Sequence, residues 1–189
     1  MNVIVIHGSY GKPFENWFPW IEQKLNLKGI ECYVPTFPTP AYQNYSSWKT
    51  LLDFYVEKGI VNENSVIVGH SCGATFATKY LIDTKIKVNA LITVSGYNLF
   101  YSGDFMDELN KSFYFNEDEC KLFCNEIFSF YSDNDPFIPQ EKLKSFAKTI
   151  KATPIQVFHA GHFNEAAGYK EFQQLYELIL KLHSKTDAE

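Results

Sequence analysis

Apolar residues follow two kinds of spacing that alternate along the chain. Six short runs are nearly continuous in apolar and β-branched residues, and they predict strands at 2–6, 30–34, 65–68, 89–94, 127–131 and 154–158. Segments between and after them carry apolar residues at helical spacing, and they predict helices at 16–28, 46–58, 72–83, about 104–125, 140–150 and 165–183. Apolar runs without polar alternation are typical of parallel strands buried on both faces. The pattern predicts an α/β fold with helices on both faces of a mainly parallel sheet.

The chain is organised as one unit. Its 189 residues are enough for a single substantial core, and the sequence contains no internal repeat or low-complexity linker. Segment 34–43 holds three of the eight prolines, but it joins a predicted strand to the next helix and is interpreted as a stiff loop. We therefore predict a single domain spanning 1–189.

Charge and hydropathy exclude several classes of protein. The net charge is −5, and no cluster of Lys and Arg forms the basic patch that nucleic-acid binding requires. The longest apolar runs have five to seven residues, far fewer than a membrane span needs. The first residues lack the basic segment and cleavage site of a signal peptide. We expect a cytoplasmic protein without a nucleic-acid or membrane partner.

One serine lies where a predicted strand becomes a predicted helix. Gly69-His70-Ser71-Cys72-Gly73 has the pattern G-x-S-x-G, in which a sharp turn strains the central residue and requires small neighbours two positions away. Such a turn lifts the hydroxyl above the sheet and leaves the Cys72 N–H at a helix N-terminus, where it can stabilise an oxyanion. A plain glycine turn needs neither feature. The motif predicts that Ser71 is a nucleophile.

A serine nucleophile needs a base and an acid from later loops of this fold. The loop after the predicted strand 127–131 offers Asp133 and Asp135, and we favour Asp135 because the following proline stiffens the turn, whereas Asp133 can cap it. The loop after 154–158 offers His159 and His162. We favour His162, which follows a glycine before the last helix.

The second oxyanion donor is expected in the loop at 7–11. Gly8 permits close backbone approach, so the next N–H, that of Ser9, is favoured, with Tyr10 as the alternative and the Ser9 hydroxyl regarded as incidental. A phosphate-binding loop is the rival interpretation, but neither G-x-G-x-x-G nor G-x-x-x-x-G-K occurs in the chain.

Neither a metal nor a cofactor is expected. His7 and His70 flank the predicted site and are expected to pack or hydrogen-bond locally, although a metal site with His162 is an alternative. The four cysteines, at 32, 72, 120 and 124, are expected to be thiols, because a chain of this size needs no disulfides in a reducing compartment.

Several segments resemble the small α/β-hydrolases of the retinoblastoma-binding protein nine / YdeN family. They are "HGSYGKPFENWFPWIEQKL", "YVPTFPTP", "VIVGHSCGA", "SDNDPFIP" and "AGHFNEAAGYKEF". The resemblance places the family triad on Ser71, Asp135 and His162. It implies the strand order 2-1-3-4-5-6 and carboxylesterase-like serine hydrolase activity (EC 3.1.1) on small esters or amides. Independently of the resemblance, the connection at 96–126 is only about thirty residues long, so we expect no large lid over the site. Cys72 departs from the apolar residue common in relatives, but only its backbone N–H is needed.

The same resemblance raises a non-enzymatic alternative. Leu122, Cys124 and Glu126 spell L-x-C-x-E, a pattern associated with retinoblastoma-pocket binding. Such a motif must be extended and accessible, whereas here it is expected to close a helix and enter a buried strand. We therefore do not expect it to bind a protein partner. The alternative function is a catalytically weak pseudo-hydrolase that serves as a binding module.

Overall fold

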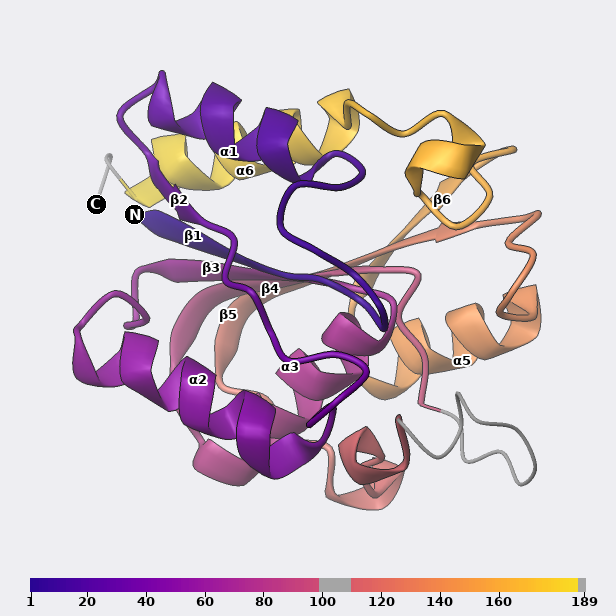
Figure 1. Ribbon diagram of the computed structural model, residues 1–189, viewed down its shortest axis with the longest axis horizontal. Coiled ribbons are helices and arrows are strands. Elements are labelled where there is room, and N and C mark those ends of the chain that lie inside the picture. The colour runs from indigo at the N-terminus through magenta and orange to yellow at the C-terminus, as the bar shows by residue number, and fades with distance from the viewer. Residues whose placement is uncertain (99–109, 187–189) are drawn as a thin grey trace.

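Six parallel strands form one sheet in the computed structural model, which describes residues 1–98 and 110–186 (Figure 1). The order β2-β1-β3-β4-β5-β6 confirms the order that the family resemblance implied. The strands are β1 (Asn2–Ile6), β2 (Glu31–Tyr33), β3 (Ser65–His70), β4 (Val88–Val94), β5 (Cys124–Ser132) and β6 (Thr153–Val157). Each lies within a few residues of its predicted range.

Helices cover both faces of the sheet, as predicted. Figure 1 shows α1 (Phe18–Asn26) and α6 (Gln173–Thr186) on one side, and α2 (Tyr45–Glu57), α3 (Cys72–Thr84) and α5 (Gln140–Thr149) on the other. No helix of the described residues is long and apolar enough to cross a membrane.

Alternation along the strands divides the core between the two layers. Val3 and Val5 pack into the cluster under α1 and α6, while Ile4 and Ile6 pack into the cluster under α2 and α3. All six residues of β3 are buried. Because β3 is covered on both faces, packing fixes its carboxyl end, which directly precedes Ser71.

The first helix is shorter than predicted. It was expected at 16–28 but begins at Phe18 and ends at Asn26. Asn16 has φ of 55°, a left-handed conformation that cannot continue into a right-handed helix. Pro19 then occupies the first turn, where its missing N–H costs nothing.

The predicted helix at 104–125 is wrong from Lys111 onward. Residues 104–109 lie outside the described residues, and from Lys111 onward the chain forms two 3₁₀ turns, Lys111–Phe113 and Glu117–Glu119, before β5 starts at Cys124. The Asn98 side chain explains part of this, because its amide donates to the Phe115 carbonyl at 2.9 Å and accepts from the Phe115 N–H at 3.2 Å. Both backbone groups are thereby withdrawn from helical bonding.

The last predicted helix, 165–183, starts eight residues late. Glu165–Ala167 is a separate 3₁₀ turn, capped by the Asn164 side chain, which accepts from the Ala167 N–H at 3.0 Å. The helix α6 begins only at Gln173. The intervening turn belongs to the histidine-bearing loop, so it helps to shape the predicted site.

Candidate active site

Ser71 adopts the backbone conformation expected of a nucleophile elbow. It lies between the end of β3 and the first residue of α3, with φ of 56° and ψ of −127°. A non-glycine residue pays an energetic cost for this region, and such strain is found mainly at functional sites. The Ser71 N–H donates to the Val94 carbonyl at 2.8 Å, which holds the turn against the end of β4.

Close backbone contacts explain the small residues around the elbow. A Cβ atom on Gly69 would lie 2.5 Å from the Ala74 Cα, and one on Gly73 would lie 2.4 Å from the His7 carbonyl oxygen. On the neighbouring loop, a Cβ on Gly8 would lie 2.9 Å from the Ser71 Cβ and 3.4 Å from its Oγ. The turn can therefore form only without side chains at these positions, and Gly8 leaves the hydroxyl uncovered.

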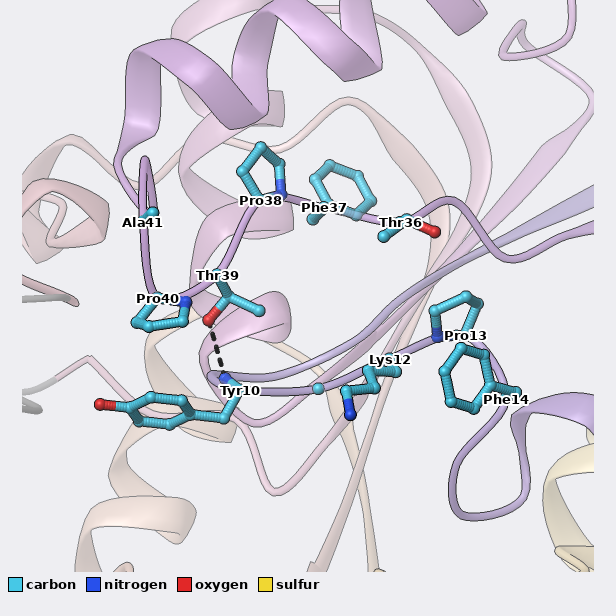
Figure 2. A pocket seen from close by; sticks show the side chains of 11 residues that line it. Tyr10, Lys12, Pro13, Phe14, Thr36, Phe37, Pro38, Thr39, Pro40 and Ala41 are labelled. Atoms are coloured by element: carbon cyan, nitrogen blue, oxygen red, sulfur yellow. Dashed lines mark hydrogen bonds between the residues drawn. The ribbon is translucent and has the colours of Figure 1, made fainter.

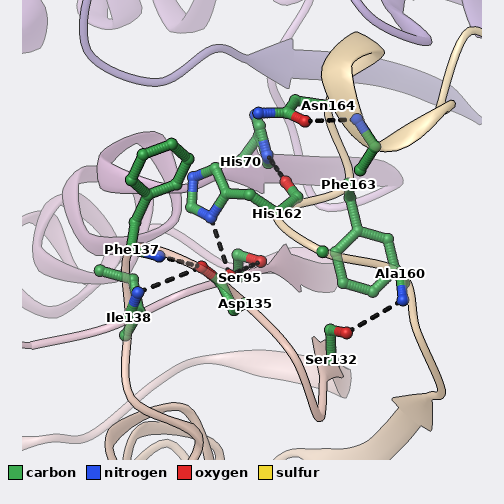
Figure 3. Close-up of polar contacts among 12 residues, drawn as sticks. His70, Ser95, Ser132, Asp135, Phe137, Ile138, Ala160, His162, Phe163 and Asn164 are labelled. Carbon is green, nitrogen blue, oxygen red and sulfur yellow. Dashed lines mark hydrogen bonds and ion pairs between the residues drawn. The ribbon is translucent and has the colours of Figure 1, made fainter.

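Asp135 and His162 meet at the carboxyl edge of the sheet (Figure 3). The Asp135 Oδ2 lies 2.8 Å from the His162 Nδ1, and the Asp135 side chain is fully buried while that of His162 is 10% exposed. Because Nδ1 faces a carboxylate, it carries the proton, which leaves Nε2 able to accept one. Among the described residues no hydrogen bond joins the ring to the Ser71 hydroxyl, and such contacts often tighten only with substrate.

The Asp135 carboxylate is fully satisfied. Oδ1 accepts the N–H groups of Phe137 and Ile138 at 2.9 and 3.1 Å, and Oδ2 also accepts the Ser95 hydroxyl at 2.8 Å. Burial by itself would raise the pKa of Asp135, but the hydrogen bond and charge of His162, with the two backbone N–H groups, lower it below its usual value. The group is therefore a stable anion that can orient the imidazole and stabilise its cation.

Four successive side chains of residues 132–135, the acid loop, hydrogen-bond to residues 159–162, the histidine loop. The Ser132 hydroxyl accepts the Ala160 N–H at 3.1 Å, Asp133 accepts the His159 N–H at 2.7 Å, and Asn134 accepts the Gly161 N–H at 2.8 Å. Asp135 to His162 is the fourth link. Asp133 is thus a cap, but of the neighbouring loop rather than of its own turn, and His159 lies with its ring 83% exposed.

His70 packs against His162 and hydrogen-bonds to its backbone. Its Nε2 lies 2.8 Å from the His162 carbonyl oxygen, and the two ring centroids are 5.1 Å apart. Complete burial, together with the proximity of His162, lowers the pKa of His70 to about 3, so the ring is neutral and donates to that carbonyl. The expectation that His70 bonds locally is confirmed.

His7 is likewise occupied by local bonds. Its Nε2 accepts the Phe37 N–H at 3.0 Å, and its Nδ1 lies 2.8 Å from the Gly8 carbonyl. Burial lowers the pKa of His7. With both nitrogens engaged it cannot ligate a metal, and no group of three or more metal-ligating side chains occurs among the described residues.

Two backbone N–H groups were predicted to stabilise an oxyanion, those of Cys72 and Ser9. Cys72 is the first residue of α3, where N–H groups have no acceptor within the helix. The Tyr10 N–H is occupied by the Thr39 hydroxyl at 2.8 Å. The Ser9 N–H faces the Cys72 sulfur, which is only a weak acceptor, so Ser9 is the better donor of the two considered. The Ser9 hydroxyl lies 3.2 Å from the Cys72 Sγ, so the two residues are neighbours. Burial raises the pKa of the Cys72 thiol to about 12, and the sulfur is therefore not a competing nucleophile.

A hollow of about 710 Å³ opens beside the loop that follows β1 (Figure 2). Its walls are residues 10–14, which follow Ser9, and residues 36–41 of the proline-rich loop. The hydrogen bond from Tyr10 to Thr39 joins the two walls. Most of its lining is apolar, a composition typical of small-molecule sites.

Three polar residues near the site were missed. Ser95 directly follows β4, and its position at the carboxyl edge was a signal that could have found it. Gln43 and Asn110, which hydrogen-bond to the Ser9 hydroxyl, carried no local signal. The Ser9 hydroxyl, which was regarded as incidental, takes part in this partly buried polar network.

The L-x-C-x-E segment lies partly within the sheet. Cys124 and Glu126 belong to β5, opposite Val88 and Ala90 of β4, and Glu126 accepts from Lys185 at 2.8 Å. The predicted strand context is therefore present, while the predicted helix before it is not.

Known proteins resemble this chain along nearly its whole length. Residues 3–181 match the family model described as serine hydrolase. The chain is 30% identical to the rat (Rattus norvegicus) serine hydrolase RBBP9 over 184 residues, covering 93% of this chain and 92% of that one. It is 25% identical to YdeN of Bacillus subtilis (strain 168) over 186 residues, covering 97% and 96%.

Solved structures share the architecture. The crystal structure of the B. subtilis ydeN gene product superposes with a TM-score of 0.85 at 24% identity, covering 97% of this chain and 98% of that one. Est1E from Butyrivibrio proteoclasticus with bound ferulic acid gives 0.75 at 14% identity, covering 100% and 90%. At these identities the structures establish the α/β-hydrolase fold alone.

Proposed function

The chain belongs to the serine hydrolase family, and from that membership we propose that it hydrolyses small carboxylic esters through an acyl-enzyme on Ser71. His162 serves as the general base, Asp135 orients it, and the N–H groups of Ser9 and Cys72 stabilise the oxyanion. The reaction needs no metal or cofactor.

The reaction follows from the roles of these groups. The His162 Nε2 takes the hydroxyl proton as the Ser71 Oγ attacks the acyl carbon. The carbonyl oxygen becomes an oxyanion between the two N–H groups, and His162 then gives its proton to the departing alkoxide. Water attacks the acyl-enzyme by the same route, releasing the acid and restoring Ser71.

The observation that carries the proposal is the Asp135–His162 hydrogen bond of 2.8 Å, together with the strained positive φ of Ser71. An acid that fixes the imidazole tautomer is useful only if the other nitrogen exchanges a proton. A binding module has no need of this arrangement or of a strained serine. Ester substrates are favoured because the similar structures include Est1E, crystallised with ferulic acid, and the carboxylesterase CesB.

Labelling with a fluorophosphonate probe tests the proposal. We expect one adduct per chain, on the peptide containing 69–73, and hydrolysis of p-nitrophenyl acetate by the same preparation. Ser71→Ala should abolish both while leaving the thermal melting temperature within a few degrees. Ser184→Ala, an exposed serine on α6, is the matched control and should label normally. A folded wild-type protein that neither labels nor hydrolyses esters would favour the binding module instead.

A further inference from the structure

A closed ring of hydrogen bonds surrounds the peptide that joins Ser9 to Tyr10. The Tyr10 N–H donates to the Thr39 hydroxyl at 2.8 Å, and that hydroxyl donates to the Gln43 side-chain oxygen. On the other side, the Gln43 Nε2 donates to the Ser9 Oγ at 2.7 Å. The ring therefore ties the Ser9 side chain to the N–H of the next residue through Gln43, and it closes through the Cα and carbonyl carbon of Ser9.

Each hydroxyl in the ring accepts one hydrogen bond and must therefore donate its own hydrogen to another group. Thr39 accepts from a backbone N–H and so donates onward, and Ser9 accepts from Gln43 and so donates onward. The Ser9 hydroxyl has its acceptors in Asn110, at 3.0 Å, and the Cys72 sulfur, at 3.2 Å. The second hydrogen of the Gln43 amide reaches the Asn110 Oδ1 at 2.7 Å. Gln43 is the member that contacts both halves of the ring.

Burial makes this network rigid. Gln43 is only 5% exposed, so water cannot replace a lost partner without entering the protein. Removing Gln43 would therefore leave the groups that face it without a partner at the buried centre of the network, while its rim at Tyr10 is exposed. Tyr10 has φ of 56°, a conformation that a flexible loop would leave unless its surroundings held it.

We propose that Gln43 is a positioning residue that fixes Ser9, and with its Cα the place of the Ser9 N–H in the oxyanion hole. It does not touch the reacting atoms; it holds Ser9 through the side-chain oxygen and, by way of Thr39, through the N–H of the next residue. The inference rests on the proposed esterase function and adds to it the determinant of the second oxyanion donor. The effect of the oxyanion hole depends on donors that are already aimed at the developing charge.

Gln43→Met tests this inference, because methionine fills a similar volume but cannot donate to Ser9. Loss of an entire oxyanion donor lowers kcat by about 10²–10³-fold, so misdirection of one should lower kcat on p-nitrophenyl acetate by about 10- to 100-fold, with KM changed less. The corresponding thionoester develops its charge on sulfur, a weaker hydrogen-bond acceptor. Its kcat should fall much less, so the ratio of oxoester to thionoester turnover should drop.

Asn89→Leu is the matched control, since it removes another buried amide, 8% exposed, on β4 and away from the loop that follows β1. It should lower the melting temperature but leave the oxoester to thionoester ratio unchanged. Ser9→Ala should shift the ratio in the same direction as Gln43→Met, and the double variant should fall short of the combined effect, because both belong to one ring.

The outcomes separate the two proposals. If wild type reacts with the fluorophosphonate but Gln43→Met keeps the wild-type ratio, or loses activity on both substrates equally, the positioning role is overturned and the esterase proposal stands. If the wild-type protein itself does not react with the fluorophosphonate, the proposed function fails. This outcome does not depend on the behaviour of any variant.

Discussion

At the scale of single residues, the two aspartates of the acid loop have different surroundings. The Asp135 side chain is fully buried and makes four hydrogen bonds, including that to His162, whereas Asp133 accepts the His159 N–H. Asp135→Asn replaces the carboxylate that fixes the imidazole tautomer, and comparable substitutions lower kcat by about 10⁴-fold. Asp133→Asn retains an oxygen that can accept the same N–H, so we expect kcat near wild type and a stability loss of at most about 1 kcal/mol.

Esterase kinetics on the two isosteric variants, with urea denaturation for stability, checks this prediction. The ranking is the decisive readout. Greater loss of turnover in Asp133→Asn than in Asp135→Asn would show that the acid had been assigned to the wrong residue.

At the scale of elements, the histidine loop takes its shape from the acid loop. Asn134 accepts the Gly161 N–H immediately before His162, and it is itself held by the Ser132 hydroxyl at 2.7 Å. Asn134→Ala removes this link. We expect a stability loss of about 1–2 kcal/mol and a decrease in kcat of about tenfold, because a buried donor loses its partner and the His162 ring loses its alignment.

Asn62→Ala is the control for this element. Asn62 accepts the Asn64 N–H at 2.9 Å in the turn before β3, at the opposite edge of the sheet from the site. Its loss should destabilise the fold by a comparable amount with kcat unchanged. Equal kinetic effects of the two substitutions would mean that the hydrogen bonds between the acid loop and the histidine loop contribute only to folding.

At the scale of the whole molecule, buried neutral histidines make stability depend on pH. The pKa of His70 is about 3 in the folded state, against an ordinary value of 6.5. Between these values the unfolded chain binds a proton that the folded chain does not, so the free energy of unfolding falls as pH decreases from about 6.5 toward 3. His7, whose pKa is also lowered by burial, adds to this slope.

His70→Gln tests the contribution of His70, because glutamine can still donate to the His162 carbonyl but does not titrate. Urea denaturation between pH 4.5 and 7.5 should give a slope reduced by about one proton relative to wild type. An unchanged slope would show that His70 is protonated in the folded protein, contrary to its burial.

The sequence alone was sufficient for the order of the six strands and of five of the six predicted helices, and for the residues proposed as the triad. Strand and helix periodicities are local properties, and in a parallel sheet all carboxyl ends face one edge, so the loops at 133–135 and 159–162 had to lie near the elbow. The G-x-S-x-G spacing is equally local, because the turn itself excludes side chains at Gly69 and Gly73.

Contacts between distant segments were decided only by the tertiary structure. Asn98 withdraws the backbone of Phe115 from helical bonding, which no property of the predicted 104–125 segment reveals. Gln43 reaches Ser9 across 34 positions and Asn110 across 67. Hydrogen bonds of this kind leave no periodicity in the sequence, since a single polar side chain in a loop looks the same whether it is solvated or buried. Packing decides which of them is enclosed, and only then does its geometry become fixed.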